Sequence, residues 1–158
     1  MNLYSLNFTQ TLPLGIHEAW RFFCDPRNLP IITPAWLDFQ MTSKLPERMY
    51  AGLVLSYRIR PFLGFPVNWI SEITHVREPE MFVDEQRFGP YRFWHHQHHF
   101  RETPAGVEVR DIINYGLKFG LFGRATNALL VRRRLDEIFA FRRQELERRF
   151  NAPALNKV

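Results

Sequence analysis

Residues 57–100 read YRIRPFLGFPVNWISEITHVREPEMFVDEQRFGPYRFWHHQHHF, and this stretch decides the fold. Apolar and polar residues alternate along it, with turn-forming residues at PFLGFP, at residues 77–79 and at residues 88–90. Alternation with a period of two indicates strands with one buried face, and clustered Gly and Pro indicate short connections. The stretch therefore predicts a meander of antiparallel strands.

The residues before the meander add one strand and two short helices. Leu3–Leu12 alternates as a strand does, and residues 16–24 place apolar side chains at helical spacing. Pro26 ends this helix, because the residue before a proline is pushed out of the α region. The following DPRNLPIITP, residues 25–34, predicts a second short helix.

The residues after the meander complete an α+β layout. Six strands are expected within residues 36–115, followed by a glycine-rich break and one long helix over residues 124–150. An antiparallel sheet must bury one face, and the long helix can cover it. We expect residues 1–150 to form a single domain and residues 151–158 a flexible tail.

The composition narrows the class of protein. The 158 residues are 46% hydrophobic, and 15% are aromatic, which favours either a thick core or an aromatic-lined cavity. The single Cys24 allows no internal disulfide, and the first residues do not resemble a signal peptide. No apolar run reaches the ~20 residues that span a bilayer. We expect a cytoplasmic protein without stable membrane insertion.

The net charge of +5 raises the question of a nucleic-acid partner. Many of the arginines lie between residues 131 and 150, mixed with acidic residues, as on the solvated face of a helix. There is neither a stacking motif of aromatics and glycines nor a zinc-finger spacing. We therefore expect no nucleic-acid partner.

The stretch quoted first, with DPRNLPIITPAWLDF before it and VRRRLDEIFAFR after it, resembles the ligand-binding SRPBCC group of the START-like, helix-grip superfamily. The resemblance extends over nearly the whole chain in order and spacing. It implies a seven-stranded antiparallel sheet curled around the C-terminal helix, with a cavity between them for an apolar or amphipathic small molecule. The superfamily includes lipid and quinone carriers, hormone receptors and polyketide cyclases, so no single ligand is implied.

Strand parity predicts which side chains face the cavity, because opposite residues of an antiparallel pair point to the same side. Two strands contribute an inward set that consists of Leu53, Leu55, Tyr57, Ile59, Val67, Trp69, Ser71 and Ile73. In the histidine-rich strand the inward set is Trp94, His96, His98 and Phe100. Its outward set is His95, Gln97 and His99, which should face solvent.

The turn at residues 103–106 extends this parity to the next strand. Pairing Phe100 with Val109 sets His98 opposite Asp111, so that an inward carboxylate meets an inward imidazole. The same register sets His96 opposite Ile113 and Trp94 opposite Tyr115.

On the other side of the histidines the register depends on the turn at residues 88–90. A bulge there sets Asp84 opposite His96 and Gln86 opposite Trp94, whereas without it Val83 and Glu85 face inward. We prefer the bulge because it keeps the parity of the preceding strand.

The long helix places one polar residue on its buried stripe. The apolar members of that stripe are Val131, Leu135, Ile138, Phe139, Leu146 and Phe150. Arg142 lies in the middle of the stripe. A buried arginine requires an acidic partner or an anionic ligand, unless its side chain extends to the cavity mouth.

Three hypotheses about the histidine pair remain open. His-x-His with a carboxylate on a neighbouring strand can bind zinc or iron, although the resemblance implies no metal and we expect neither metal nor other cofactor. Catalysis would use His98, or His96, as an acid/base held by Asp111, but no nucleophile motif accompanies it. The favoured hypothesis is a hydrogen-bonding patch at one end of an apolar pocket.

The function we expect is non-enzymatic binding of a lipid-, quinone- or polyketide-like molecule with a polar or acidic end. The expected binding residues are Tyr57, Trp69, Asp84, Gln86, Trp94, His96, His98, Asp111, Tyr115, Phe139 and Arg142. The aromatic members of this set have an alternative role as ordinary core. An alternative function is a polyketide cyclase- or dehydratase-like enzyme that uses the same pocket, and a third is a structural or protein-interaction module with a filled cavity.

Overall fold

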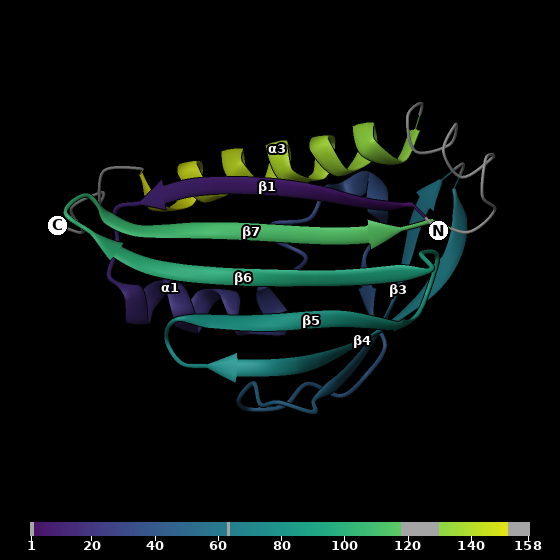
Figure 1. Ribbon diagram of the computed structural model, residues 1–158, viewed down its shortest axis with the longest axis horizontal. Coiled ribbons are helices and arrows are strands. Elements are labelled where there is room, and N and C mark those ends of the chain that lie inside the picture. Colours follow the sequence, from purple (N-terminus) through teal and green to yellow (C-terminus); the bar gives the residue numbers. More distant parts are fainter. Residues whose placement is uncertain (1, 63, 118–129, 152–158) are drawn as a thin grey trace, which may run out of the picture.

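In the computed structural model, the described residues 2–62, 64–117 and 130–151 form a seven-stranded antiparallel sheet with two α-helices (Figure 1). The helical elements are α1 (Ile16–Phe23), the short 3-10 helices η1 (Pro26–Asn28) and η2 (Ala35–Leu37), and α3 (Arg132–Phe150). The strands are β1 (Leu3–Leu12), β2 (Gln40–Met41), β3 (Val54–Phe62), β4 (Phe65–Arg77), β5 (Met81–Phe88), β6 (Phe93–Thr103) and β7 (Gly106–Gly116).

This architecture confirms the expected α+β helix-grip fold. The strand order is β1-β7-β6-β5-β4-β3-β2, and the sheet curls so that β3 stands steeply to β1 (Figure 1). The long helix α3 runs along β1 and contacts it. Residues 124–129, expected to begin the long helix, and residues 152–158, most of the expected tail, lie outside the described residues.

The strand register follows the parity expected from the sequence around the histidines. His98 pairs with Asp111 and His96 with Ile113 in the β6–β7 ladder, and Asp84 pairs with His96 in the β5–β6 ladder. The pairing of Asp84 with His96 is the one expected for a bulge in the turn at residues 88–90. Phe82 and Asp84 line the inner pocket, so Val83 between them lies on the other face.

The sheet irregularities nearest to Asp84 lie in the β4–β5 pairing. The register shifts there between Ile70 and Ser71 and again between Ile73 and His75. Across the first shift β5 has one extra residue, and across the second β4 has one. Between them Ser71 and Ile73 stay on the same face as Asp84, which keeps that carboxylate inside the curl.

Two apolar clusters form the core, one at each end of the curled sheet. The first surrounds α1, where the ring of Trp20 meets Phe82 and Phe100 edge-on at centroid distances of 6.0 and 5.5 Å. The second surrounds the first half of α3, where Phe139 stacks on Phe8 at 4.2 Å. Both clusters use side chains from the inner face of the sheet, so α1 and α3 cover the same face.

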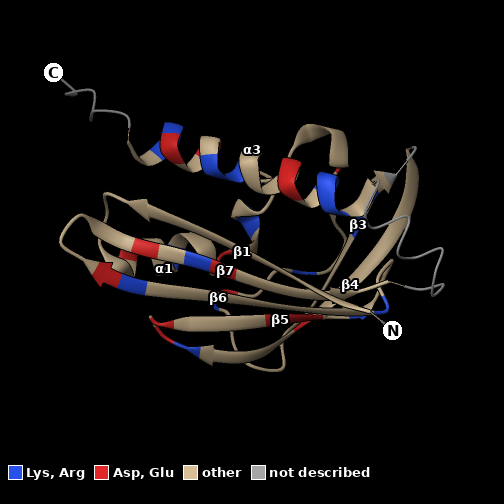
Figure 2. Cartoon of the chain, turned by 45° about the horizontal axis from the view of Figure 1, so that its top comes forward, with Lys and Arg blue, Asp and Glu red and all other residues tan. Residues whose placement is uncertain are grey.

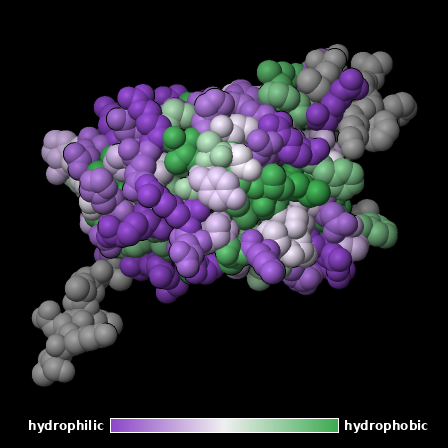
Figure 3. Space-filling model, turned by 90° about the horizontal axis from the view of Figure 1, so that it is seen from below, coloured by the Kyte–Doolittle hydropathy of each residue, from purple (hydrophilic) through white to green (hydrophobic). Residues whose placement is uncertain are grey.

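The outward side of α3 is charged, as the mixture of arginines and acidic residues predicts. Arg132 and Arg133 form ion pairs with Asp136 and Glu137 one turn later, at 3.1 and 3.0 Å. Blue and red segments alternate along this helix in Figure 2. The face shown in Figure 3 is mixed, with apolar side chains gathered among hydrophilic ones. No helix within the described ranges is long and apolar enough to cross a membrane.

Gly106 allows the close approach of the β6–β7 hairpin to the end of β1. Its φ is +122°, and a Cβ atom there would lie 2.1 Å from the carbonyl oxygen of Leu12. We predict that Gly106→Ala lowers the free energy of unfolding by about 2–4 kcal/mol, because it adds a backbone clash to backbone strain. Equilibrium urea unfolding measures this change.

Gly52→Ala is the matched control, since Gly52 also has a positive φ, of +93°, but a Cβ atom added there would meet nothing within 4 Å. This substitution should lower the free energy of unfolding only by the backbone strain, about 1–2 kcal/mol. An equal loss of unfolding free energy in the two variants would show that the close approach of Gly106 to Leu12 does not contribute to stability.

Candidate functional site

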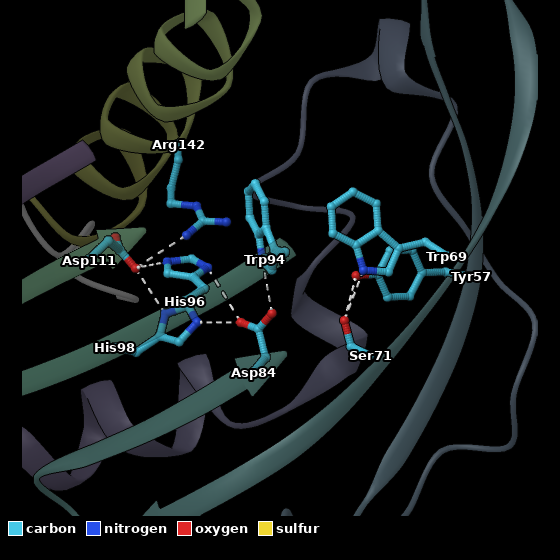
Figure 4. A network of polar contacts seen from close by, with 9 residues as sticks. All are labelled: Tyr57, Trp69, Ser71, Asp84, Trp94, His96, His98, Asp111 and Arg142. Atoms are coloured by element: carbon cyan, nitrogen blue, oxygen red, sulfur yellow. Dashed lines mark hydrogen bonds and ion pairs between the residues drawn. The ribbon is translucent and has the colours of Figure 1, made fainter. Parts of the chain in front are cut away.

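The candidate site is a pocket of about 180 Å³ between the inner face of the sheet and α3. Its walls are mostly apolar, with Leu37 from η2, Leu55 and Ile59 from β3, and Leu135 and Phe139 from α3. Polar side chains reach it from two sides (Figure 4). The arrangement is an apolar chamber with a few polar groups that converge on it.

The larger polar group is an Asp–His cluster of four residues from three adjacent strands. Asp84 comes from β5, His96 and His98 from β6, and Asp111 from β7. Because His96 and His98 are two residues apart on one strand, their rings stand on the same face. The ring centroids are 3.8 Å apart. The two carboxylates lie on opposite sides of this imidazole pair (Figure 4).

Each imidazole of the cluster lies between the two carboxylates. His96 Nε2 is 2.9 Å from Asp111 Oδ1, and its Nδ1 is 3.4 Å from Asp84 Oδ1. His98 Nε2 is 2.9 Å from Asp84 Oδ1. His98 Nδ1 is also 2.9 Å from Asp111 Oδ1, but this contact is not aligned as a hydrogen bond. All four ring nitrogens therefore face a carboxylate oxygen.

Burial makes the charges of the cluster interdependent. The exposed fraction of the side chain is 17% for Asp84, 7% for Asp111 and 6% for His96. Burial alone would raise the pKa of each aspartate, but hydrogen bonds with His96 and His98 outweigh it, and the pKa of both carboxyls lies below the ordinary value. Burial alone would lower the pKa of His96, but hydrogen bonds to Asp111 and Asp84 raise it. The cluster therefore holds ionised carboxylates next to proton-donating rings.

Arg142 of α3 adds a positive charge on the Asp111 side. Its Nη1 lies 3.6 Å from Asp111 Oδ1, and its guanidinium carbon lies 4.6 Å from the centre of the Phe139 ring. The side chain is only 12% exposed, and its Nε has no hydrogen-bond partner in the described part of the chain. Asp111 is thus the acidic partner that the buried stripe requires, and one donor of Arg142 remains unused.

A second polar group lies on β3 and β4. Ser71 Oγ accepts a hydrogen bond from Trp69 Nε1 at 3.0 Å and lies 3.1 Å from the Tyr57 hydroxyl. The rings of Tyr57 and Trp69 stack at 5.8 Å. Burial, followed by the nearby charge of Asp84, raises the pKa of Tyr57, so its hydroxyl is neutral. This group offers neutral hydrogen-bonding atoms.

The structure brings most of the expected residues together. The expected residues that line the pocket are Tyr57, Trp69, Asp84, Trp94, His96, His98, Phe139 and Arg142. Asp111 lies behind the imidazoles and is not part of the pocket wall. Ser71, Tyr91 and Leu135 are among the lining residues that were not in the expected set. The alternation of the strand marks Ser71 as inward, and the helical spacing of apolar residues marks Leu135 as inward. No such pattern applies to Tyr91 in the β5–β6 connection.

Besides Asp111, two expected residues do not line the pocket, Gln86 and Tyr115. Gln86 donates a hydrogen bond to the carbonyl oxygen of Tyr91 at 2.8 Å and accepts one from the Tyr91 N–H at 3.2 Å, so it braces the β5–β6 connection. Its Cα pairing with Trp94 is absent from the ladder among the described residues, which ends at Glu85. Tyr115 is fully buried, with its ring 5.4 Å from Tyr4 and 5.8 Å from Tyr91. It belongs to the core behind the pocket.

The outward histidines lie on the opposite face of β6. His95, Gln97 and His99 are half-buried, whereas His96 and His98 between them are buried. His99 Nε2 lies 2.9 Å from Gln97 Oε1 on this outer face. The histidine-rich strand therefore divides into a cluster inside the curl and residues outside it, and only the inner pair reaches the pocket.

No protein-family model matches the chain, and no curated protein matches it by sequence. Solved structures match its fold over nearly the full length of both chains. Protein Ms6760 from Mycobacterium smegmatis is 15% identical, with a TM-score of 0.67 over 96% of this chain and 98% of its own. TTHA0849 from Thermus thermophilus is 17% identical, with a TM-score of 0.67 over 96% and 99%.

A plant protein shares the same architecture. The ginseng major latex-like protein 151 from Panax ginseng is 14% identical, with a TM-score of 0.68 over 96% of this chain and 99% of its own. The fold of this chain is thus the one that these three proteins have. At these identities the likeness concerns the fold.

The charge balance of the cluster generates a prediction about Asp111. Asp111→Ala should lower the free energy of unfolding by about 1–3 kcal/mol, because it leaves the buried Nε2 donor of His96 without its acceptor and removes the negative charge beside Arg142. Asp111→Asn should cost less, since the amide oxygen remains an acceptor. Equilibrium chemical unfolding of the two variants measures both values.

Asp136→Ala is a suitable control, because Asp136 forms an exposed ion pair with Arg132 on the outer side of α3. Its effect should be much smaller, as is usual for surface pairs. If Asp111→Ala were as mild as Asp136→Ala, the cluster would not depend on its carboxylate.

Proposed function

We propose that the protein binds a hydrophobic or aromatic small molecule in the pocket, with a polar end of the ligand directed at the Asp–His cluster. The observation that carries this proposal is an apolar pocket lined at one end by His96, His98, Asp84 and Arg142. Small-molecule sites have this composition, with apolar walls for affinity and a few polar groups for orientation. The fold supports it, because SRPBCC proteins typically bind hydrophobic ligands.

The size of the pocket limits the ligand. A cavity of ~150 Å³ in another protein accommodates benzene, and drug-sized ligands occupy roughly 300–1,000 Å³. The volume of about 180 Å³ here therefore fits a ligand of one or two rings, or a short chain, better than a two-chain lipid. The aromatic rings of Trp69 and Trp94 at the wall favour an aromatic ligand.

The unused hydrogen-bonding atoms support a ligand with a polar group. Arg142 Nε is buried without a partner among the described residues, and Arg142 lines the pocket. An acceptor oxygen on the ligand would satisfy this donor and remove the penalty of a buried, unpaired group. On the opposite side, Tyr57 and Ser71 provide hydroxyls for a second polar substituent.

An acid/base enzyme of the cyclase or dehydratase kind is the second candidate. It is favoured by the position of His96 and His98 at the pocket wall with carboxylates beside them. Against it, both nitrogens of His96 already face carboxylates, which leaves none free for a substrate proton. The volume of the pocket argues against the third hypothesis, a structural or protein-interaction module with a filled cavity.

Filling the pocket should weaken ligand binding. We expect 1-naphthol, an aromatic probe with one hydroxyl, to quench the fluorescence of Trp69 and Trp94 in a saturable manner. Leu135→Trp places a large ring at the pocket wall and should weaken this binding at least tenfold. Native mass spectrometry of the purified protein should in addition show a co-purified molecule that this variant lacks.

Ala140→Trp is the matched control, because Ala140 lies on the exposed side of the same helix. It should bind the probe as the unaltered protein does, while circular dichroism shows that both variants are folded. Unchanged probe affinity in a folded Leu135→Trp variant would overturn the assignment of this pocket.

A further inference from the structure

The Asp–His cluster is divided into groups that face the pocket and one that lies behind it. Asp84, His96 and His98 line the pocket, whereas Asp111 does not. The donor atoms of Asp84, His96 and His98 all lie within 4.8 Å of one another. We propose that these three side chains bind a divalent transition-metal ion, whose remaining coordination positions face the apolar pocket.

The orientation of the two rings supports this assignment. His96 Nε2 and His98 Nδ1 both lie 2.9 Å from Asp111 Oδ1. If these nitrogens carry the ring protons, the lone pairs of His96 Nδ1 and His98 Nε2 point towards Asp84. A carboxylate that orients metal-binding histidines from behind is a common feature of such sites. Asp111 would hold the His96 ring, with which it forms a hydrogen bond, in the tautomer that binds a metal, and it lies beside Nδ1 of His98.

The surroundings of the other groups agree with this arrangement. Trp94 Nε1 donates a hydrogen bond to Asp84 Oδ2 at 3.3 Å, while Oδ1 faces the imidazoles. The positive charge of Arg142 beside Asp111 compensates the charge of that carboxylate. Asp84 and two neutral imidazoles then form a site of charge −1 for a divalent cation. Two of the proposed metal ligands, Asp84 and His96, therefore each have a supporting hydrogen bond.

The distances leave room for an ion after a small adjustment. Ligand atoms at about 2.0–2.2 Å from one metal lie roughly 3–4 Å from each other. The separations from Asp84 Oδ1 are 2.9 Å to His98 Nε2 and 3.4 Å to His96 Nδ1, so a small rotation of the Asp84 side chain is sufficient.

The chemistry of the ligands selects the kind of ion. Two imidazoles and one carboxylate with open positions are typical of zinc(II) and of non-haem iron(II), whereas magnesium and calcium prefer oxygen ligands alone. The sequence favours an unmetallated pair, because the family resemblance implies no metal. The structure places one carboxylate in front of the rings and the other behind them. This geometry reverses that preference.

Titration of the metal ion alone tests the site, independently of any organic ligand. Protein freed of metals by chelator dialysis should bind one equivalent of Zn²⁺ by calorimetry. Cobalt(II), as a spectroscopic substitute, should give visible d–d bands typical of nitrogen and oxygen ligands. Asp84→Asn and His98→Gln should each weaken binding of Zn²⁺ at least 100-fold, and Asp111→Asn about tenfold to 100-fold.

His99→Gln and Glu85→Gln are the matched controls, since they alter the same strands on the other face. They should leave the affinity and the cobalt spectrum unchanged, and all variants should remain folded by circular dichroism. Absence of stoichiometric Zn²⁺ binding would overturn the proposal. So would equal affinity in Asp84→Asn, His98→Gln and the controls, which would indicate binding to surface histidines only. Ligand binding by the pocket could survive either result.

Discussion

The pairing of two buried carboxylates with two imidazoles is the constraint on which the rest of the structure depends. Asp84 and Asp111 lie on the inner face of a sheet where water is scarce, and an ionised carboxylate without partners would be very costly there. His96 and His98 provide those partners only when β5, β6 and β7 have their observed register. A slip of one residue would turn both rings outward and leave the carboxylates unpaired.

The same constraint explains why the core has two apolar parts. Phe82 of the cluster around α1 stacks on His98 at 4.1 Å, and Phe139 of the cluster around α3 meets His96 at 5.9 Å. The Asp–His cluster thus lies between the two parts and is enclosed by aromatic rings on both sides. Phe82 and Phe139 thus pack against the polar groups, and both also line the pocket.

The sequence carries a large share of this information, because strand parity depends on a strict period of two. Parity within β6 separates His96 and His98 from His95 and His99, and the hairpin at residues 103–106 brings Asp111 to His98. Parity also predicts the inward position of Asp84 once the register is chosen. These features depend on local alternation and short turns, which are visible in the amino-acid order.

The remaining features depend on packing between segments distant in sequence. Gln86 braces a connection, because the backbone groups of Tyr91 come within reach of its amide, and no alternation pattern describes such a contact. Tyr115 has the parity of a pocket residue, yet other aromatic rings cover it. Parity assigns each residue to a face of the sheet. The packing of the side chains then decides which residues of that face line the chamber.

The polar groups and most of the apolar walls come from different parts of the chain. The Asp–His cluster belongs to the central strands β5, β6 and β7, whereas Leu37, Leu55, Ile59 and Leu135 come from η2, β3 and α3. Substitutions in these walls would alter the shape of the chamber without disturbing the register that holds the four charged and proton-donating groups. Recognition of ligand shape can therefore diverge during evolution while the polar centre is inherited unchanged.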